Sequence, residues 1–242
     1  MVSIRNLSHT FEDAPVLQDI SLEISEGEIL AIMGSSGGGK TTLLRCVSGL
    51  IEATAGDVEV DGVNVKTNPN EARTRMGMVF QGAALFDFMT VQENVVFGIN
   101  RQKKYSRKEA LVKAKEALIN VGILEVDLQK MPSELSGGMR KRVGMARALA
   151  LNPKVMLYDE PTTGLDPITT FSIDSLVRSV RSDFNVTSLV VSHDVNSVVR
   201  MADRVAFLHG GELVFEGTPS DFLVSDDPNI RELVEKSRAT VL

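Results

Sequence analysis

The sequence predicts an α/β protein with a mostly parallel core sheet and a helical subdomain inserted into it. Three observations lead to this fold class. The first part of the chain is a series of short apolar and β-branched runs cut by turn pairs such as Glu26-Gly27, which is typical of strands. From about Asp87 to Leu149 the apolar residues take helical spacing instead. Beyond Leu149, apolar strands return with a helix between them, which indicates βαβ units and a parallel sheet.

Short apolar runs mark the expected strands along the whole chain. In chain order they are Val2–Leu7, Ser21–Ile24, Ile29–Met33, Val58–Val60, Met76–Phe80, Val155–Tyr158, Ser188–Ser192 and Val205–His209. Ile29–Met33 and Met76–Phe80 are continuous apolar runs, a pattern typical of strands that are buried on both faces.

The expected helices have their own spacing and stop signals. In chain order they are Lys40–Ser48, Lys108–Val121, Met139–Leu151 and about Thr169 to Ser182. Gly49 ends the first helix and Asn152-Pro153 ends the third. The second helix places apolar residues three and four positions apart, with lysine and glutamate on its other face.

The composition is that of an ordinary globular protein. Of the 242 residues, 43% are hydrophobic and 24% are charged, and no apolar run approaches the roughly 18 residues that a membrane span needs. The sequence starts with a strand pattern and shows no signal-peptide pattern. Its one cysteine, Cys46, cannot form an internal disulfide, so we expect a cytoplasmic protein in which Cys46 is buried by packing. The net charge of −6 argues against nucleic acid as a partner.

A glycine-rich loop follows the strand Ile29–Met33. Gly34-Ser-Ser-Gly-Gly-Gly-Lys40-Thr41 fits the pattern G-x-x-x-x-G-K-[ST] (Walker A), and the next residues begin a helix. Strand, loop and helix in this order place phosphates on the backbone N–H groups of a helix N-terminus. We therefore expect a bound nucleoside triphosphate. The residues expected to contact it are Gly34, Ser35, Ser36, Gly37, Gly38, Gly39, Lys40, Thr41 and Thr42.

The strand Val155–Tyr158 ends in two carboxylates, Asp159 and Glu160. Next to a phosphate loop, Asp159 is placed to organise Mg²⁺ through water while Thr41 supplies a hydroxyl directly. Glu160 points to the other side of the strand end and is our candidate for polarising the attacking water. The alternative is a charged strand end that is only exposed to solvent.

Together these motifs resemble the ATPases of ATP-binding cassette (ABC) transporters. The matching segments are Gly34–Thr41, Gln81, Leu135–Met139, Asp159-Glu160, Gly164-Leu165-Asp166 and His193. The resemblance extends from Val2 to about Asp221 and implies a P-loop ATPase of one domain. It implies a RecA-like core with an N-terminal antiparallel β subdomain over 1–86 and 150–220, a helical subdomain over about 87–149, and a tail over 221–242.

The Leu-Ser-Gly-Gly element is the most specific part of this resemblance. In the family, two copies meet head to tail, so that the resemblance assigns Ser136, Gly137 and Gly138 to the ATP held by a second copy. These residues precede the Met139–Leu151 helix, where N–H donors and the helix dipole favour a phosphate. A flexible Ser-Gly-Gly hinge is the alternative.

Four further roles follow from the resemblance. Phe11 resembles the aromatic residue that stacks on adenine, although a strand-end core phenylalanine is the alternative. Gln81 resembles the glutamine that contacts Mg²⁺ and water and senses the transmembrane partner. Asp166 resembles the aspartate that links the two sites, and His193 the histidine that binds the γ-phosphate. His9 and His209 match no motif, and we expect them at the surface or at strand ends.

Three segments also resemble the ATPases of lipid-trafficking systems, of the Mla type and the MCE-associated (Mkl-like) type. They are Gln81–Phe97, Met131–Arg142 and Asp159–Thr169. The expected function is therefore an ATP-hydrolysing motor for phospholipid or other lipid. Its expected partners are a second copy of the chain, a separate integral-membrane permease and an MCE-type lipid-binding protein, on the cytoplasmic face of the inner (plasma) membrane. An ATPase of an amino-acid or osmolyte importer is the alternative, and a soluble non-transport ABC protein is a third.

Two segments have open interpretations. Apolar residues crowd the stretch Ala83–Met89 next to Gln81, which suits a groove for a permease helix; core packing is the alternative. The tail carries a short expected helix, Ile230–Lys236, which would either pack on the partner cassette or dock loosely.

Overall fold

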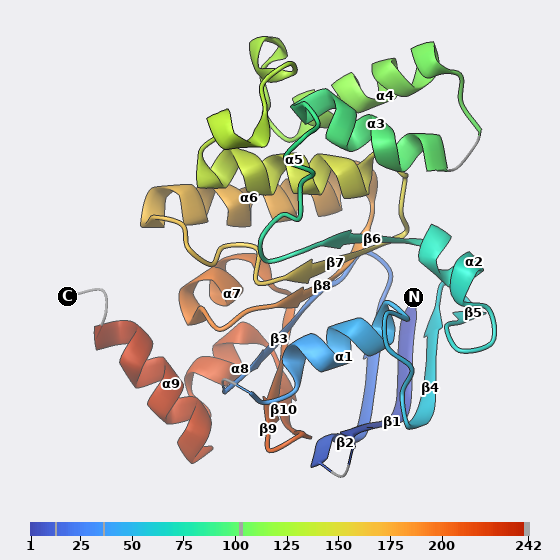
Figure 1. The fold of residues 1–242 in the computed structure, drawn as a ribbon. Coiled ribbons are helices and arrows are strands. Elements are labelled where there is room, and N and C mark those ends of the chain that lie inside the picture. Colours follow the sequence, from blue (N-terminus) through green and yellow to red (C-terminus); the bar gives the residue numbers. More distant parts are fainter. Residues whose placement is uncertain (13, 36, 102–103, 240–242) are drawn as a thin grey trace.

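The structure is a computed structural model that describes residues 1–12, 14–35, 37–101 and 104–239 (Figure 1). Its core is a six-stranded sheet in the order β10-β9-β3-β8-β7-β6. The strands are β3 (Ile29–Gly34), β6 (Met76–Val79), β7 (Val155–Asp159), β8 (Thr187–Val191), β9 (Arg204–His209) and β10 (Glu212–Gly217). All neighbours pair in parallel except β9 and β10, which form an antiparallel hairpin at one edge. The expected mostly parallel core sheet is confirmed.

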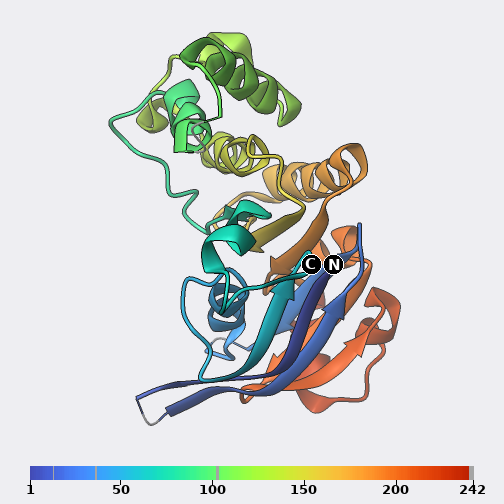
Figure 2. The same cartoon turned by 90° about the vertical axis from the view of Figure 1, so that its right-hand side faces the viewer.

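A second, antiparallel sheet covers one side of the molecule (Figure 2). Its order is β2-β1-β4-β5, and its strands are β1 (Val2–Phe11), β2 (Ala14–Ile24), β4 (Ala55–Val60) and β5 (Val63–Asn64). β1 and β2 extend well beyond the expected Val2–Leu7 and Ser21–Ile24. Register shifts along β1, together with positive φ at Asn6 and Asp19, break the apolar alternation that the prediction relied on.

Helix α1 (Lys40–Val47) lies between the two sheets (Figure 1). Leu43, Leu44 and Val47 are fully buried in one apolar cluster with residues of both sheets. Cys46 belongs to the same cluster and is buried, as expected. Because α1 starts directly after the phosphate loop, packing against two sheets fixes that loop in place.

The two sheets also meet directly at a seam between β2 and the turn that joins β9 to β10. Gln18 N donates to the Gly211 carbonyl at 2.8 Å, and Gln18 Nε2 donates to the Gly210 carbonyl at 3.0 Å. Gly211 has φ +85°, and a Cβ there would lie 2.7 Å from the Val16 carbonyl oxygen. This close approach requires glycine.

The helical insertion forms a separate layer at one end of the core sheet (Figure 2). It holds α3 (Val91–Arg101), α4 (Arg107–Asn120), two 3₁₀ turns (Glu125–Asp127 and Pro132–Glu134) and α5 (Gly137–Leu149). α4 begins with a capping box in which Ser106 and Glu109 each bond the other's backbone N–H. α5 packs against β6, so the insertion is joined to the core through the helix that carries Ser136 at its N-terminus.

The remaining helices cover the other parts of the core sheet. They are α2 (Pro69–Thr74), α6 (Pro167–Phe184), α7 (Val195–Met201), α8 (Pro219–Leu223) and α9 (Pro228–Ala239). α6 begins two residues before the expected start because Asp166 caps it. No helix among the described residues is long and apolar enough to cross a membrane.

The tail differs from the expectation of a loosely docked helix. α9 lies on its own cassette, where Ile230 and Val234 are buried in a cluster with Phe207 of β9 and Phe222 of α8. Because these side chains interlock with the core sheet, the helix is not loosely docked. Packing of its remaining surface on the partner cassette stays a prediction.

Candidate nucleotide site

Four parallel strands deliver the predicted residues to one edge of the core sheet. The phosphate loop follows β3, Gln81 follows β6, Glu160 follows β7 and His193 follows β8. They line a common hollow of about 290 Å³, whose walls are Val16, Gly37, Gly38, Gly39, Lys40, Thr41, Thr42, Gln81, Glu160 and His193. The carboxyl edge of a parallel sheet is the usual ligand site of α/β proteins. Ser36, also predicted here, lies outside the described residues.

The phosphate loop is closed by main-chain contacts that exclude side chains. A Cβ at Gly34 would lie 2.3 Å from the Leu208 carbonyl oxygen, and one at Gly39 would lie 2.8 Å from that of Val16. Gly39 also has φ +89°, in the left-handed region. The loop therefore keeps its shape because β2 and β9 press on it from two sides.

Lys40 holds this loop from inside. Its Nζ donates to the carbonyls of Gly34 and Ser35, at 2.9 Å each. Burial lowers the pKa of Lys40, and the nearby carboxylates of Glu160 and Asp159 oppose that shift. A buried ammonium at the N-terminus of a helix is suited to binding phosphate oxygens.

Asp159 and Thr41 offer oxygen donors side by side. Thr41 Oγ1 donates to Asp159 Oδ1 at 3.3 Å. Burial raises the pKa of the Asp159 carboxyl, and the Thr41 hydroxyl bond works in the opposite direction. One carboxylate and one hydroxyl next to a phosphate loop are the ligands that Mg²⁺ accepts when a nucleotide supplies the other oxygens, so the donor set fits magnesium.

Glu160 is held by two side chains in an unusual backbone conformation. Its Oε2 lies 2.6 Å from His193 Nδ1 and accepts a hydrogen bond from Thr163 Oγ1 at 2.8 Å. Its φ is +50°, which a residue with a side chain adopts only at a cost. Such strain is typical of functional positions, because the surrounding contacts must maintain it. Thr163 was missed from the sequence, where it reads as an ordinary turn residue.

The second group of predicted residues does not line this hollow. Ser136 caps α5 by accepting from Met139 N at 3.2 Å, and Asp166 caps α6 by accepting from Thr169 N at 3.0 Å. The two caps are neighbours, since a Cβ at Gly138 would lie 2.5 Å from Thr169 Cγ2. Gly137, the other predicted glycine, is also close to this region, since a Cβ there would lie 3.2 Å from Leu165 Cδ2. The chain thus presents two separate half-sites, one on the core sheet and one at the paired N-termini of α5 and α6.

Phe11 stands at the end of β1 with 47% of its surface exposed. The alternative of a core phenylalanine is therefore wrong, and the ring is free to stack on a base. His9, expected at the surface or a strand end, is instead only 8% exposed and packs edge-on against Phe11, with ring centroids 4.5 Å apart. The register shifts of β1 turned it inward.

Two cationic side chains of α5 bind backbone carbonyls at and next to the site, and they were not predicted. Lys141, only 5% exposed, donates to the Gln81 carbonyl and, at 3.1 Å, to the Glu160 carbonyl. Arg147 donates to the carbonyls of Ala83 and Ala84 at 2.8 and 2.6 Å. The sequence signal that could have identified Lys141 is a lysine at a buried position of an amphipathic helix.

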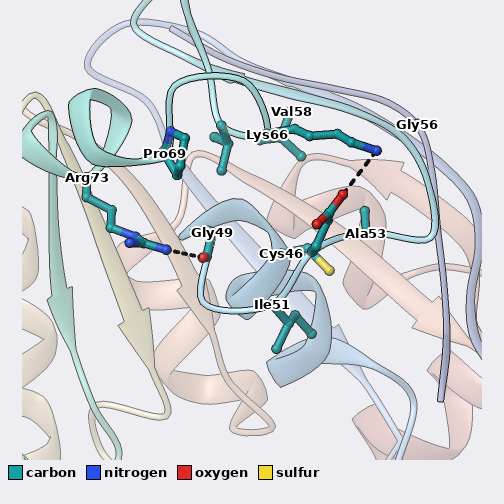
Figure 3. Close-up of a pocket in the computed structure, with 11 residues that line it drawn as sticks. Cys46, Gly49, Ile51, Ala53, Gly56, Val58, Lys66, Pro69 and Arg73 are labelled. Carbon is teal, nitrogen blue, oxygen red and sulfur yellow. Dashed lines mark hydrogen bonds and ion pairs between the residues drawn. The ribbon is translucent and has the colours of Figure 1, made fainter.

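A second hollow, of about 210 Å³, lies behind α1, between the antiparallel sheet and α2 (Figure 3). Arg73 donates to the Gly49 carbonyl on one side, and Lys66 forms a 3.2 Å ion pair with Glu52 on the other. Cys46 also lines it, and burial raises the pKa of its thiol to about 11. None of the predicted nucleotide residues lies in its walls, so it is a separate feature.

The comparisons with known proteins agree with this geometry. A family model described as ABC transporter matches residues 17–163. The chain is 39% identical over 234 residues to the glutamine transport ATP-binding protein GlnQ of Escherichia coli (strain K12), covering 96% of each chain. It is 34% identical to the protein trigalactosyldiacylglycerol 3, chloroplastic, of Arabidopsis thaliana, over 98% of this chain and 74% of that one. Other relatives are named for arginine transport, methionine import and sulfate/thiosulfate import.

Among solved structures, the chain resembles a dimeric post-hydrolysis state of the ATP-binding cassette MJ0796 bound to ADP and Pi. The TM-score is 0.82 at 32% identity, over 90% of this chain and 99% of that one. The fold expectation, with its antiparallel β subdomain and helical subdomain, is therefore confirmed. The chain belongs to the ABC transporter family, as an ATP-hydrolysing cassette that uses ATP and Mg²⁺.

Proposed function

We propose that the chain works as a head-to-tail homodimer beneath a separate integral-membrane permease, on the cytoplasmic face of the membrane. One observation carries the dimer: the chain presents two half-sites that do not meet within it. The hollow of the phosphate loop includes Lys40 and Glu160 but not Ser136 or Asp166. A second copy rotated by a two-fold axis brings the cap of one chain to the phosphate loop of the other. MJ0796, at 32% identity, is described as dimeric in a state bound to ADP and Pi.

Each residue of the half-sites then has a task. Lys40 and the loop N–H groups hold the phosphates, and Mg²⁺, bound through Thr41, Asp159 and Gln81, supplies charge neutralisation on them. Glu160, with its carboxylate oriented by Thr163 and His193, accepts the proton of the attacking water.

The remaining predicted residues bind the two ends of the nucleotide. His193, bonded to Glu160 through Nδ1, has its other ring nitrogen for the γ-phosphate. Ser136, Gly137 and Gly138 of the second copy donate to the same phosphate, with Asp166 next to them, and Phe11 stacks on the adenine ring.

The permease contact is proposed at the segment that follows Gln81. Phe86 packs between Phe88 and Phe97, with ring centroids 5.8 and 4.8 Å apart, and Phe88 remains 75% exposed. Ala83 is only 1% exposed and packs against α5, so part of the segment is core, as the alternative held, and part is an exposed aromatic surface. A helix seated on Phe88 would act on Gln81, seven residues away.

For the transported substrate we propose a small polar solute of the amino-acid class. The relatives named for glutamine, arginine, methionine and sulfate transport favour this over the lipid expected from the sequence. Lipid is the second candidate, because the name of the Arabidopsis relative contains that of a galactolipid. The MCE-type partner belongs to this second candidate alone.

Purification of the tagged chain from its native membranes distinguishes the candidates. A permease that co-purifies with a soluble amino-acid receptor supports the first, and a permease with bound phospholipid and an MCE-type protein overturns it in favour of the second. If no integral-membrane protein co-purifies, the coupling proposal fails.

A matched pair of surface variants tests the docking site. Phe88→Glu should abolish permease binding while ATP binding is kept, because a buried carboxylate in an apolar interface is costly. Val126→Glu, at a position that is also 75% exposed but lies on the helical insertion, is the control and should bind the permease normally. Equal binding by both variants contradicts the site.

A further inference from the structure

We propose that Lys141 is a positioning residue for ATP hydrolysis: it ties the main chain of Gln81 and of Glu160 to α5, and so links the two composite sites of the dimer. This inference rests on the proposed function and adds a means by which one site affects the other.

The contacts of Lys141 are specific. The residue lies on α5 and is 5% exposed, with its Nζ donating to the Gln81 carbonyl and to the Glu160 carbonyl at 3.1 Å. These carbonyls lie just after the ends of two different core strands, β6 and β7. Burying an ammonium is costly unless hydrogen bonds satisfy it, so this side chain holds both strand ends at a defined distance from α5.

Glu160 is the residue that most needs such support. Its φ of +50° is unfavourable for a residue with a side chain. Its N–H donates to the Val191 carbonyl at 3.0 Å, and Lys141 binds its carbonyl. Both backbone polar groups are therefore fixed, and Thr163 and His193 fix the carboxylate. Removing Lys141 frees one of these restraints and lets the strained peptide relax.

The same helix carries Ser136 as its N-cap. Lys141 lies five positions after Ser136, which is about 7.5 Å along the helix axis. In the proposed dimer Ser136 binds the nucleotide of the partner copy, whereas Lys141 holds the Glu160 and Gln81 of its own chain. When Ser136 binds the partner's ATP, any movement of α5 is thus transmitted over fewer than two helical turns to the residues that orient the water.

The test compares Lys141→Met with Arg142→Met in full-length protein. Met keeps the length and apolar stem of Lys141 but donates no hydrogen bond. We expect the kcat for ATP to fall about 10- to 100-fold, because a misplacement of about 1 Å costs that much. The affinity of the monomer for ATP should stay within about twofold, since no phosphate contact is lost. Lys141→Arg, which keeps the donors, should recover most of the rate.

Arg142 is the matched control. It follows Lys141 on α5 and also binds a carbonyl, that of Val121, together with Ser172 Oγ at 2.6 Å, but it does not contact Glu160 or Gln81. Arg142→Met should lower the melting temperature and leave the kcat of the folded protein unchanged. If Lys141→Met does not fold, Lys141→Gln, which keeps a neutral donor, carries the same test of kcat against ATP affinity.

A wild-type kcat in Lys141→Met overturns the proposal. So does a loss of rate that accompanies an equal loss of ATP affinity or that Arg142→Met reproduces, because either result indicates a purely structural role. Glu160→Gln distinguishes a failure of the proposed function from a failure of the Lys141 inference. If it retains hydrolysis, the proposed function fails, and if it loses hydrolysis while Lys141→Met does not, only the present inference fails.

Discussion

Arg200→Met should destabilise the protein in a pH-dependent way. Asp174 on α6 has a side chain that is 2% exposed, and the Nε and Nη2 of Arg200 on α7 donate to its Oδ2 at 2.9 and 2.7 Å. The Met side chain fills much of the same space but leaves a buried carboxylate without its cation.

The expected magnitude follows from the unequal burial of the two partners. Breaking a buried ion pair by removing one member costs about 3–5 kcal/mol. Because the Arg200 side chain is 35% exposed, water can partly replace it, so we expect a loss at or below the bottom of that range, about 2–3 kcal/mol at pH 7. For a protein of this size that corresponds to a fall in Tm of about 4–12 °C.

The pH dependence has a definite sign. Burial raises the pKa of Asp174, and the hydrogen bonds and charge of Arg200 oppose that shift. Removing Arg200 therefore raises the pKa further. A carboxyl whose folded pKa lies above its unfolded value takes up a proton more readily in the folded state, so the destabilisation is greatest above the folded pKa and shrinks as pH falls through it.

Urea unfolding at pH 7 and pH 5 measures both effects. The free energy of unfolding of Arg200→Met should lie closer to that of the wild type at pH 5 than at pH 7. Adding Asp174→Asn removes the buried charge and should restore at least half of the loss at pH 7. A loss below about 1 kcal/mol at pH 7, or a double variant no more stable than the single one, would refute the reasoning.

Three further outcomes are expected. Glu160→Gln should bind ATP normally and lose hydrolysis by about 10²–10⁴-fold, the range for a general base, with the ATP-bound dimer persisting on gel filtration; near-wild-type turnover would remove Glu160 from that role. Ser136→Arg should leave ATP binding to the monomer intact but block ATP-driven dimerisation, because a bulky cation would occupy the place of the partner's γ-phosphate; dimers seen by light scattering would contradict the head-to-tail arrangement. Truncation after Ser225 should lower the free energy of unfolding by about 3–6 kcal/mol, because the burial of Ile230 and Val234 is lost; a calorimetric Tm equal to that of the full chain would contradict the docking of α9.

The sequence predicted the nucleotide half-site well because its residues follow buried strands. Continuous apolar runs such as Ile29–Met33 are typical of core strands in a parallel sheet, and the residues after parallel strands reach the same edge. Gln81, Glu160 and His193 each follow such a run and line one hollow with the phosphate loop. Their catalytic roles remain predictions.

Elements without a strong periodic pattern were harder to predict. β10 was missed because its residues are only half-buried at an edge, and α7 because its seven residues span fewer than two turns. The burial of His9, which was expected at the surface or at a strand end, was missed because the register shifts in β1 cannot be read from residue types. Lys141 and Arg147 were missed for a different reason, since their carbonyl partners lie about sixty residues away along the chain.

The seam between the two sheets gives the nucleotide a mechanical role. In the proposed function, adenine stacks on Phe11 of the antiparallel sheet and the phosphates bind the core sheet, and the backbone bond from Gln18 to Gly211 joins the two sheets. A ligand that spans the seam ties both sheets together, so its binding energy opposes their separation. The amide of Gln18 should therefore exchange with solvent through a partial opening in which β2 detaches, and ATP should slow that exchange in proportion to its affinity.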